Sequence, residues 1–221
     1  MENGPYRLVL ASSSPRRQEI VRGLAEHVAC VPPDVEEAGA RQGESPEELA
    51  LSLSLKKARR VAEMVGLAMV LGADTLVVLG GEVLGKPGSA EEATDMLRRL
   101  KGRTHRVVTG VTVLDGRTGR TSASARASEV TMRRYSEGEI GAYVASGEPF
   151  DKAGAYAAQD VDFRPAASIE GCYLNVVGLP LCEVVTLLEG MGVSGRLRAG
   201  WSPPAECIDC TLGPRSEVVF Q

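Results

Sequence analysis

The N-terminal architecture of this chain is set by LVLASSSPRRQEI, residues 8–20. The first residues form a short apolar run that predicts a strand, and the later residues predict a helix. Ser14 is a suitable N-cap, and Pro15 fits the first helical position, where a missing N–H costs no hydrogen bond. The backbone N–H groups of that turn, the serine hydroxyls and the guanidinium groups of Arg16 and Arg17 would converge on one spot, which suits a phosphate chain. A capped helix with two solvated arginines explains the same residues.

Composition limits the class of protein. The chain has 221 residues, enough for one large domain or two small lobes. Hydrophobic residues make up 43% of it and aromatic residues only 4%, which predicts a core of Val, Leu and Ala. The net charge of −4 gives no general attraction to nucleic acid. No apolar run approaches the roughly 20 residues that span a bilayer, and no charged-then-apolar leader precedes the first strand. We therefore expect a soluble, cytoplasmic protein that binds neither nucleic acid nor membrane.

Cysteine and histidine usage limits the chemistry. The chain has five cysteines, mostly inside apolar runs, and this odd number favours reduced thiols over a disulfide framework. Cys207 and Cys210 form a single C-x-x-C pair, which is weak support for a zinc site. His27 and His105 lie in no metal-ligand pattern, so the sequence gives little support for a histidine-bound metal or a Ser-His-Asp triad. Any catalytic metal would have to be bound by carboxylates.

Helix starts are marked by capping boxes, in which a serine is followed three positions later by glutamate. The boxes at residues 45–48, 89–92 and 136–139 predict helices that end near Val65, Leu100 and Ala145. Further helices are predicted after Pro15 and at Leu181–Glu189.

Apolar and β-branched runs between the helices predict strands. They lie at Leu8–Leu10, Val28–Val31, Met69–Leu79, Val107–Leu114, Ala125–Met132 and Tyr173–Val177. The turn residues Asp115–Gly119 predict a long hairpin, so at least one strand pair is antiparallel. The predicted class is α/β with a mixed sheet. After Gly192 the composition shifts to Gly, Pro and Arg, so we expect a domain at residues 1–192 and a partly ordered extension at 193–221.

Two charged residues interrupt apolar patterns. Lys57 falls inside the apolar arc of the helix predicted to begin after Ser45, where a lysine either extends to water or points into a polar cleft. Asp74 interrupts the apolar run Met69–Leu79. A carboxylate buried there must be hydrogen-bonded, paired or metal-bound, although a turn aspartate between two short strands is an equal alternative. Gly72–Ala73, directly before Asp74, leave room for a ligand or metal to approach.

Three further polar features lie in predicted loops. Lys86 precedes the helix that starts at Ser89 and could face the same cleft. The pair Glu36–Glu37 follows a strand and could supply a carboxylate to a divalent ion, or simply be solvated. Gln159 ends a stretch rich in small residues, and its amide offers one acceptor and two donors, enough to read the edge of a base.

Together these stretches resemble the Maf family of nucleotide pyrophosphatases. The matching segments occur in the family's order over about residues 7–190: Ala11–Arg17, Glu36–Glu37, Lys57–Ala58, Gly72–Thr75, Gly85–Pro87, Thr109–Val111, Asp151–Tyr156, Gln159 and Asn175–Pro180. No single segment is unique to the family, but the ordered set is highly specific.

The resemblance implies a fold and a reaction. The fold would be elongated and two-lobed, with a central cleft, similar to the inosine-triphosphatase-like enzymes. The reaction would be metal-dependent hydrolysis of a nucleoside triphosphate to monophosphate and pyrophosphate, in house-cleaning of the nucleotide pool. The paired arginines and the Asp151–Tyr156 stretch with Gln159 resemble the branch that acts on dTTP and UTP. Family members are often homodimers.

The resemblance also implies roles for individual residues. Asp74 would accept the proton, while Arg16, Thr75 and Gln159 would govern substrate choice. Combined with the charge pattern, it gives a substrate-binding set of Ser12, Arg16, Arg17, Lys57, Thr75, Lys86 and Gln159, with Glu37 and Asp74 holding Mg²⁺ or Mn²⁺.

The chain departs from the family pattern beside Gln159. The family usually has glycine at the next position, where this chain has Asp160, and residues 161–165 are also atypical. The resemblance therefore specifies the reaction more firmly than the base. An alternative is a nucleotide-binding regulator of cell division with little catalysis, in line with the family's link to arrest of septum formation. A nucleic-acid binder is disfavoured by the acidic net charge and scarce aromatics.

Overall fold

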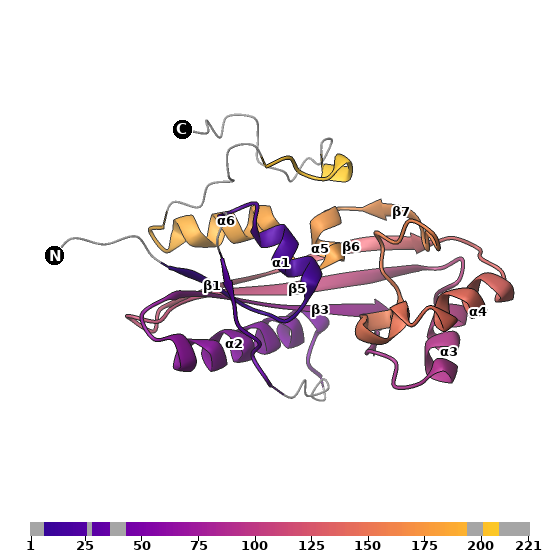
Figure 1. Ribbon diagram of the computed structural model, residues 1–221, viewed down its shortest axis with the longest axis horizontal. Coiled ribbons are helices and arrows are strands. Elements are labelled where there is room, and N and C mark those ends of the chain that lie inside the picture. The colour runs from indigo at the N-terminus through magenta and orange to yellow at the C-terminus, as the bar shows by residue number, and fades with distance from the viewer. Residues whose placement is uncertain (1–6, 26–27, 36–42, 194–200, 208–221) are drawn as a thin grey trace.

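The computed structural model describes residues 7–25, 28–35, 43–193 and 201–207. Within these ranges a seven-stranded sheet runs along the long axis of the molecule in the order β2-β1-β3-β5-β6-β7, with β4 also paired to β3 (Figure 1). The strands are β1 (Leu8–Ala11), β2 (Ala29–Cys30), β3 (Met69–Leu79), β4 (Glu82–Leu84), β5 (Thr104–Asp115), β6 (Thr121–Met132) and β7 (Ala166–Glu170). β1 is parallel to β2 and β3, and the other pairs are antiparallel. The predicted mixed sheet and the β5–β6 hairpin are confirmed.

Helices cover both faces of this elongated sheet, and others cluster at its far end (Figure 1). The helices are α1 (Pro15–Val21), α2 (Pro46–Val65), α3 (Ala90–Leu100), α4 (Glu137–Ala145), α5 (Tyr173–Val177) and α6 (Leu181–Gly190), with 3-10 turns η1 (Glu148–Asp151), η2 (Ala153–Ala155) and η3 (Ala205–Cys207). Helix α2 lies on one face and α1 and α6 on the other. No helix of the described ranges is long and apolar enough to cross a membrane.

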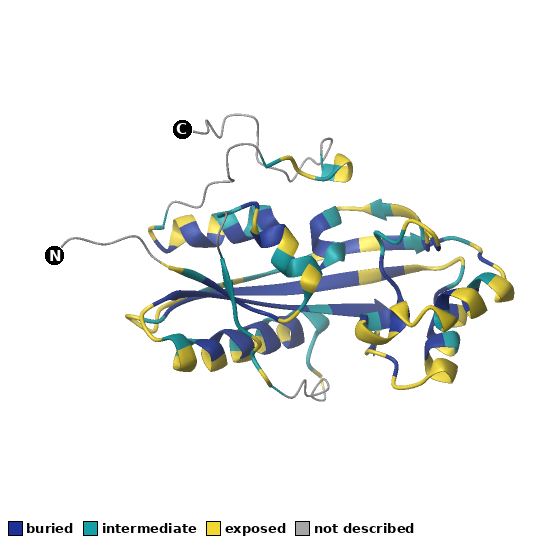
Figure 2. Ribbon diagram, in the orientation of Figure 1, coloured by how far each residue is buried: buried dark blue, intermediate teal, exposed yellow. Residues whose placement is uncertain are grey.

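Alternation along the strands assigns side chains to the two faces. In β1, Val9 and Ala11 belong to the apolar cluster that includes Ala58 of α2, whereas Leu10 belongs to the cluster with α1 and α6. Because successive side chains of a strand point to opposite faces, one short strand serves two cores. Figure 2 shows the outcome: the central strands are almost continuously buried, and α2 combines buried residues with exposed residues on its outer side.

The predicted capping boxes form at two helices and change at the third. Ser45 with Glu48, and Ser136 with Glu139, make the reciprocal pair of bonds that defines the box. Ser89 accepts from the N–H of Glu92, but the Glu92 carboxylate accepts from the N–H of Gly88 at 2.7 Å. The prediction for α1 is correct in position, with Ser14 as the N-cap residue, yet the Ser14 side chain makes no capping bond. Its backbone N–H instead donates to the hydroxyl of Ser12 at 3.1 Å.

The strand predicted at Tyr173–Val177 is wrong, because these residues form α5. A short apolar run fits a buried strand or a buried helical turn equally well. Here Cys172 caps the helix by accepting from the N–H of Asn175, and the Asn175 side chain donates to Val107 O at 3.0 Å and to Ser128 Oγ at 2.9 Å. These long-range bonds select the helix. The short strands β4 and β7 carry no strong strand pattern and were not predicted.

Part of the predicted extension packs on the domain. Trp201 and Cys207 lie against the apolar cluster of α1 and α6. A Cβ at Gly23 would lie 2.8 Å from the Trp201 ring, so this position accommodates the ring only as glycine. Cys210, the other half of the C-x-x-C pair, lies outside the described residues.

Two glycines let the backbone of α2 rest directly on the sheet. A Cβ at Gly72 of β3 would lie 2.2 Å from Ser54 O, and one at Gly110 of β5 would lie 2.3 Å from Ala50 O. Contacts that short do not occur, so any larger residue would push α2 outward. The hydroxyls of Ser54 and Thr112 also bond across this interface at 2.7 Å. The position of α2 over β3 and β5 is therefore tightly fixed.

Gly72→Ala is expected to lower the free energy of unfolding by about 3 kcal/mol, because the added methyl must displace backbone atoms of α2. Urea denaturation followed by circular dichroism would measure it. Gly141→Ala is the matched control: Gly141 lies inside α4 with nothing within 4 Å of an added Cβ, so alanine there should be neutral or stabilising. Equal denaturation midpoints for Gly72→Ala and the unmodified protein would contradict the close-packing argument.

Candidate functional site

The site begins at a gap along one edge of β3. On this edge β1 pairs with Met69–Gly72 and β4 pairs with Val77–Leu79, while β5 occupies the opposite edge. No strand in the described part of the chain pairs with residues 73–76 on the β1 side. The chain leaving β1 and the chain leaving β4 border the gap, so loops rather than a strand lie beside residues 73–76 on this edge of β3.

A cavity of about 990 Å³ opens at this gap. Its volume lies at the upper end of the range of small-molecule sites, roughly 300–1,000 Å³. The predicted substrate and catalytic residues all line it: Ser12, Arg16, Arg17, Lys57, Asp74, Thr75, Lys86 and Gln159. Glu37, the other predicted metal ligand, lies outside the described residues. The cavity takes its walls from α1 and α2 at one end of the sheet and from the η1–η2 region at the other, in keeping with the predicted cleft.

Lys57 and Asp74 form a buried ion pair at the floor of the cavity. The Nζ of Lys57 donates to Oδ1 of Asp74 at 2.5 Å, and the two side chains are 7% and 6% exposed. Asp74 lies two positions beyond Gly72 in β3, so its side chain points to the face on which α2 rests. Its Oδ2 has no hydrogen-bond partner among the described residues. The lysine therefore points into a polar cleft, and the aspartate lies within a strand rather than in a turn.

Thr75 points to the opposite face and meets Arg17. The Nη2 of Arg17 donates to Thr75 Oγ1 at 2.8 Å, and its Nε donates to Gly178 O at 2.7 Å. Thr75 and Thr109 hydroxyls lie 2.9 Å apart, and Thr109 Oγ1 donates to Asn175 O at 2.9 Å. Because the single proton of the Thr109 hydroxyl goes to Asn175 O, Thr75 is the donor in its short contact with Thr109, while Gly178 O lies farther from Thr75 Oγ1, at 3.5 Å. The bonds thus run in one direction from Arg17 to α5, and they fix the Arg17 guanidinium instead of leaving it solvated.

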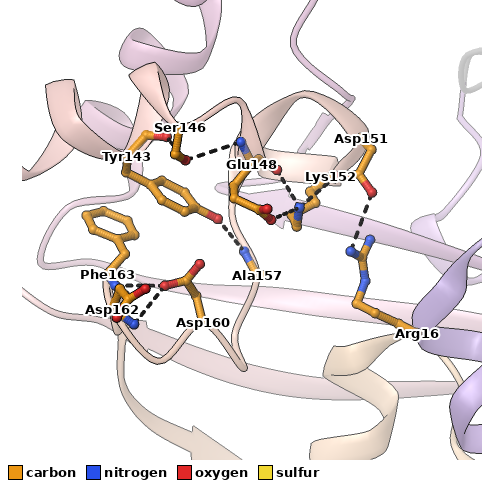
Figure 3. Close-up of polar contacts among 10 residues, drawn as sticks. All are labelled: Arg16, Tyr143, Ser146, Glu148, Asp151, Lys152, Ala157, Asp160, Asp162 and Phe163. Atoms are coloured by element: carbon orange, nitrogen blue, oxygen red, sulfur yellow. Dashed lines mark hydrogen bonds and ion pairs between the residues drawn. The ribbon is translucent and has the colours of Figure 1, made fainter.

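Arg16 reaches the opposite wall of the cavity (Figure 3). Its Nη1 lies 3.5 Å from Oδ2 of Asp151. The buried ammonium of Lys152 donates to Asp151 Oδ1 at 2.7 Å, to Glu148 Oε2 at 3.0 Å and to Glu148 O. Burial opposes ionisation of Asp151, but the hydrogen bond and charge of Lys152 and the charge of Arg16 hold the pKa of its carboxyl below the ordinary value.

Asp151 and Lys152 were missed as individual site residues. Both line the cavity. The signal in the sequence was a pair of charged residues directly before the small residues Ala153–Ala155. A lysine that is buried beside such small residues needs acidic or carbonyl partners, and acidic residues occur just before it in the chain.

A buried histidine anchors the wall that carries Gln159. The Nε2 of His105 and the hydroxyl of Tyr156 lie 2.7 Å apart, with both residues buried. Burial lowers the pKa of His105 to about 4, so the ring is neutral at pH 7. The side chain of Gln159 lines the cavity and has no hydrogen-bond partner among the described residues. His105 thus has a structural role here, while the Gln159 amide remains available to a ligand.

The sequence of this chain matches one family of known proteins over most of its length. A family model described as "Maf-like protein" matches residues 7–191. The dTTP/UTP pyrophosphatase of Dehalococcoides mccartyi strain CBDB1 is 40% identical over 205 residues, covering 93% of this chain and 91% of the relative. The dTTP/UTP pyrophosphatase of Syntrophotalea carbinolica is 47% identical over 188 residues, covering 84% of each chain. Among solved structures, the Staphylococcus aureus Ham1 protein overlaps with a TM-score of 0.40 at 18% identity, covering 57% of this chain and 71% of that one.

Lys57→Met is expected to lower the free energy of unfolding by about 3–5 kcal/mol at pH 7, because it leaves the Asp74 carboxylate buried without its partner. Adding Asp74→Asn should recover part of that loss, since the remaining group is then uncharged. Urea titrations of the two single variants and the double variant form a double-mutant cycle. Strictly additive losses would show that the two side chains do not interact energetically.

Proposed function

The chain belongs to the Maf family, and we propose that it hydrolyses nucleoside triphosphates, dTTP and UTP above all, to nucleoside monophosphate and pyrophosphate. One observation carries the proposal: the buried Lys57–Asp74 pair lies at the floor of a cavity whose walls hold several further cationic side chains. The relatives named dTTP/UTP pyrophosphatase support the choice of nucleotide, because they align over most of the chain.

The triphosphate would be bound by the cationic side chains at the gap. Arg16, Arg17 and Lys86 line the cavity together with Lys57 and the hydroxyl of Ser12. Guanidinium groups suit phosphate because they present paired donors in a fixed plane. Arg17 is already oriented by Thr75 and Gly178, so its position costs little to organise on binding. The contact of Arg16 with the exposed Asp151 is long, at 3.5 Å, which lets phosphate oxygens replace the carboxylate.

Asp74 would act as the general base. Its Oδ1 is held by Lys57, which leaves Oδ2 to accept a proton from the attacking water. As the water oxygen bonds to the α-phosphorus, the bond from that phosphorus to the α–β bridging oxygen breaks and pyrophosphate leaves. Lys57 and the arginines would stabilise the negative charge that collects on the departing group.

A divalent cation fits this donor set as a partner of the substrate. No group of three or more His, Cys, Asp and Glu side chains that could hold a metal occurs within the described ranges. Mg²⁺, however, is commonly bound through one or two carboxylates together with substrate phosphates, and the Asp74 carboxylate lines the cavity, where Oδ1 can contact a cation as well as Lys57 while Oδ2 takes the proton. We propose that Asp74 and Glu37 hold Mg²⁺ or Mn²⁺ with the phosphates. When bound, the cation would neutralise phosphate charge and make a coordinated water more acidic.

Base selection would fall to the wall opposite α1. The amide of Gln159 can donate to and accept from the edge of uracil or thymine. Thr75 and Arg16 would shape the pocket beside it. We further propose that the catalytic domain spans residues 1–192 and that the protein acts as a homodimer in the cytoplasm.

A pyrophosphate-release assay tests the function. We expect release from dTTP and UTP with Mg²⁺ or Mn²⁺, weaker release from CTP and purine nucleotides, and none with a chelator. Asp74→Asn should lower kcat by at least about a hundredfold, the lower range for loss of a general base. Asp95→Asn, an exposed change of the same kind on α3, is the control and should have no effect.

Other outcomes separate the alternatives. Tight dTTP binding by the unmodified protein without pyrophosphate release would favour a nucleotide-binding regulator. Undiminished turnover in Asp74→Asn would show that another group takes the proton.

A further inference from the structure

Asp160 follows Gln159 directly, and its side chain organises the next turn (Figure 3). One carboxylate oxygen, Oδ1, accepts from the backbone N–H of Phe163 at 2.7 Å and from that of Asp162 at 3.1 Å. Asp160 is not part of the cavity wall, whereas Gln159 is. The carboxylate is therefore in no position to contact a ligand directly, and its two hydrogen bonds act on the backbone of the turn.

The turn held by Asp160 is fixed from several directions. The guanidinium of Arg133 donates to Phe163 O at 2.7 Å and to Arg164 O at 3.1 Å. Arg164 has φ of 44°, a conformation that costs energy for a residue with a side chain and persists only where its surroundings impose it. The Asp160 carboxylate is one of the groups that imposes it, because it ties the two preceding N–H groups together.

The backbone on the N-terminal side of Gln159 is also held in place. The Phe163 ring stacks on Tyr143 with centroids 4.2 Å apart and planes at 12°. The Tyr143 hydroxyl in turn accepts from the backbone N–H of Ala157 at 3.2 Å. Gln159 thus lies between two fixed points, Ala157 before it and Asp160 after it, and both are joined through the same aromatic stack.

We propose that Asp160 is a positioning residue that sets nucleobase specificity, by holding the turn that presents the Gln159 amide to the base. The inference rests on the proposed function. A hydrogen-bond donor and acceptor discriminate between bases only when their direction is fixed, because a mobile amide can rotate to pair with the edge of a different base. Asp160 is not among the described residues with positive φ, so nothing in its own backbone demands glycine. Glycine at this position would remove the carboxylate and free the chain.

The test compares variants of Asp160 on several nucleotides. We would measure kcat and KM for dTTP, UTP and CTP in the full-length protein and in Asp160→Gly, Asp160→Ala and Asp160→Asn. Asp160→Ala should lower the dTTP-over-CTP ratio of kcat/KM by about five- to tenfold, mainly through a higher KM for dTTP, as expected for loss of a well-placed hydrogen bond. Asp160→Gly should lower it further. Asp160→Asn should restore the ratio to within about twofold, because its amide oxygen can accept the same two N–H bonds.

Asp162→Asn is the matched control. It removes a charge from an exposed side chain in the same turn and keeps the backbone N–H that Asp160 accepts, so the ratio should not change. Equal losses for all three nucleotides in Asp160→Ala, an unchanged ratio, or an Asp160→Asn variant as impaired as Asp160→Ala would each overturn the inference while leaving the proposed function intact. Absence of pyrophosphate release from the unmodified protein would overturn the proposed function, and the inference with it.

Discussion

Helix α2 lies with its backbone against β3 and β5 because Gly72 and Gly110 carry no side chains, and the rest of the site depends on that contact. This contact fixes the position of α2 over β3, and with it the position from which Lys57 reaches Asp74 at 2.5 Å. The ion pair is costly to bury, and it is stable only because the geometry between its partners is fixed. Close packing of one helix thus makes a charged floor possible inside an apolar sheet.

The gap in the sheet explains why neighbouring residues of one strand have different tasks. Asp74 points toward α2 and meets Lys57, whereas Thr75 points toward α1 and meets Arg17. Elsewhere in β3 these two faces are separated by adjacent strands. On the β1 side of β3, no strand in the described structure pairs with residues 73–76, which lie between the segments paired with β1 and β4. One cavity therefore reaches both faces of the sheet at this point. The proposed chemistry and the proposed phosphate binding can therefore meet at consecutive positions.

The long strands connect this floor to a wall built at the other end of the molecule. His105 near the start of β5 holds Tyr156, Arg16 of α1 reaches Asp151, and the turn after Gln159 is tied to Arg133 beyond β6. The wall is irregular in backbone but rich in specific hydrogen bonds. Such a segment can have a well-defined conformation without being a helix or a strand. Selection of a base requires a well-defined conformation of the groups that contact it.

The sequence alone determined the regular elements with strong periodicity, such as α2 and β3, and it identified Lys57 and Asp74 because charge inside an apolar pattern must be compensated. It also carried a family resemblance specific enough to name the reaction. Tertiary structure alone decided that Lys57 and Asp74 are partners, that Tyr173–Val177 is helical, and that Asp160 holds the turn beside Gln159. These features depend on which distant strands and loops become neighbours, and local periodicity contains no information about that choice. A buried polar group shows in the sequence that it needs a partner, but only the folded chain shows which group that partner is.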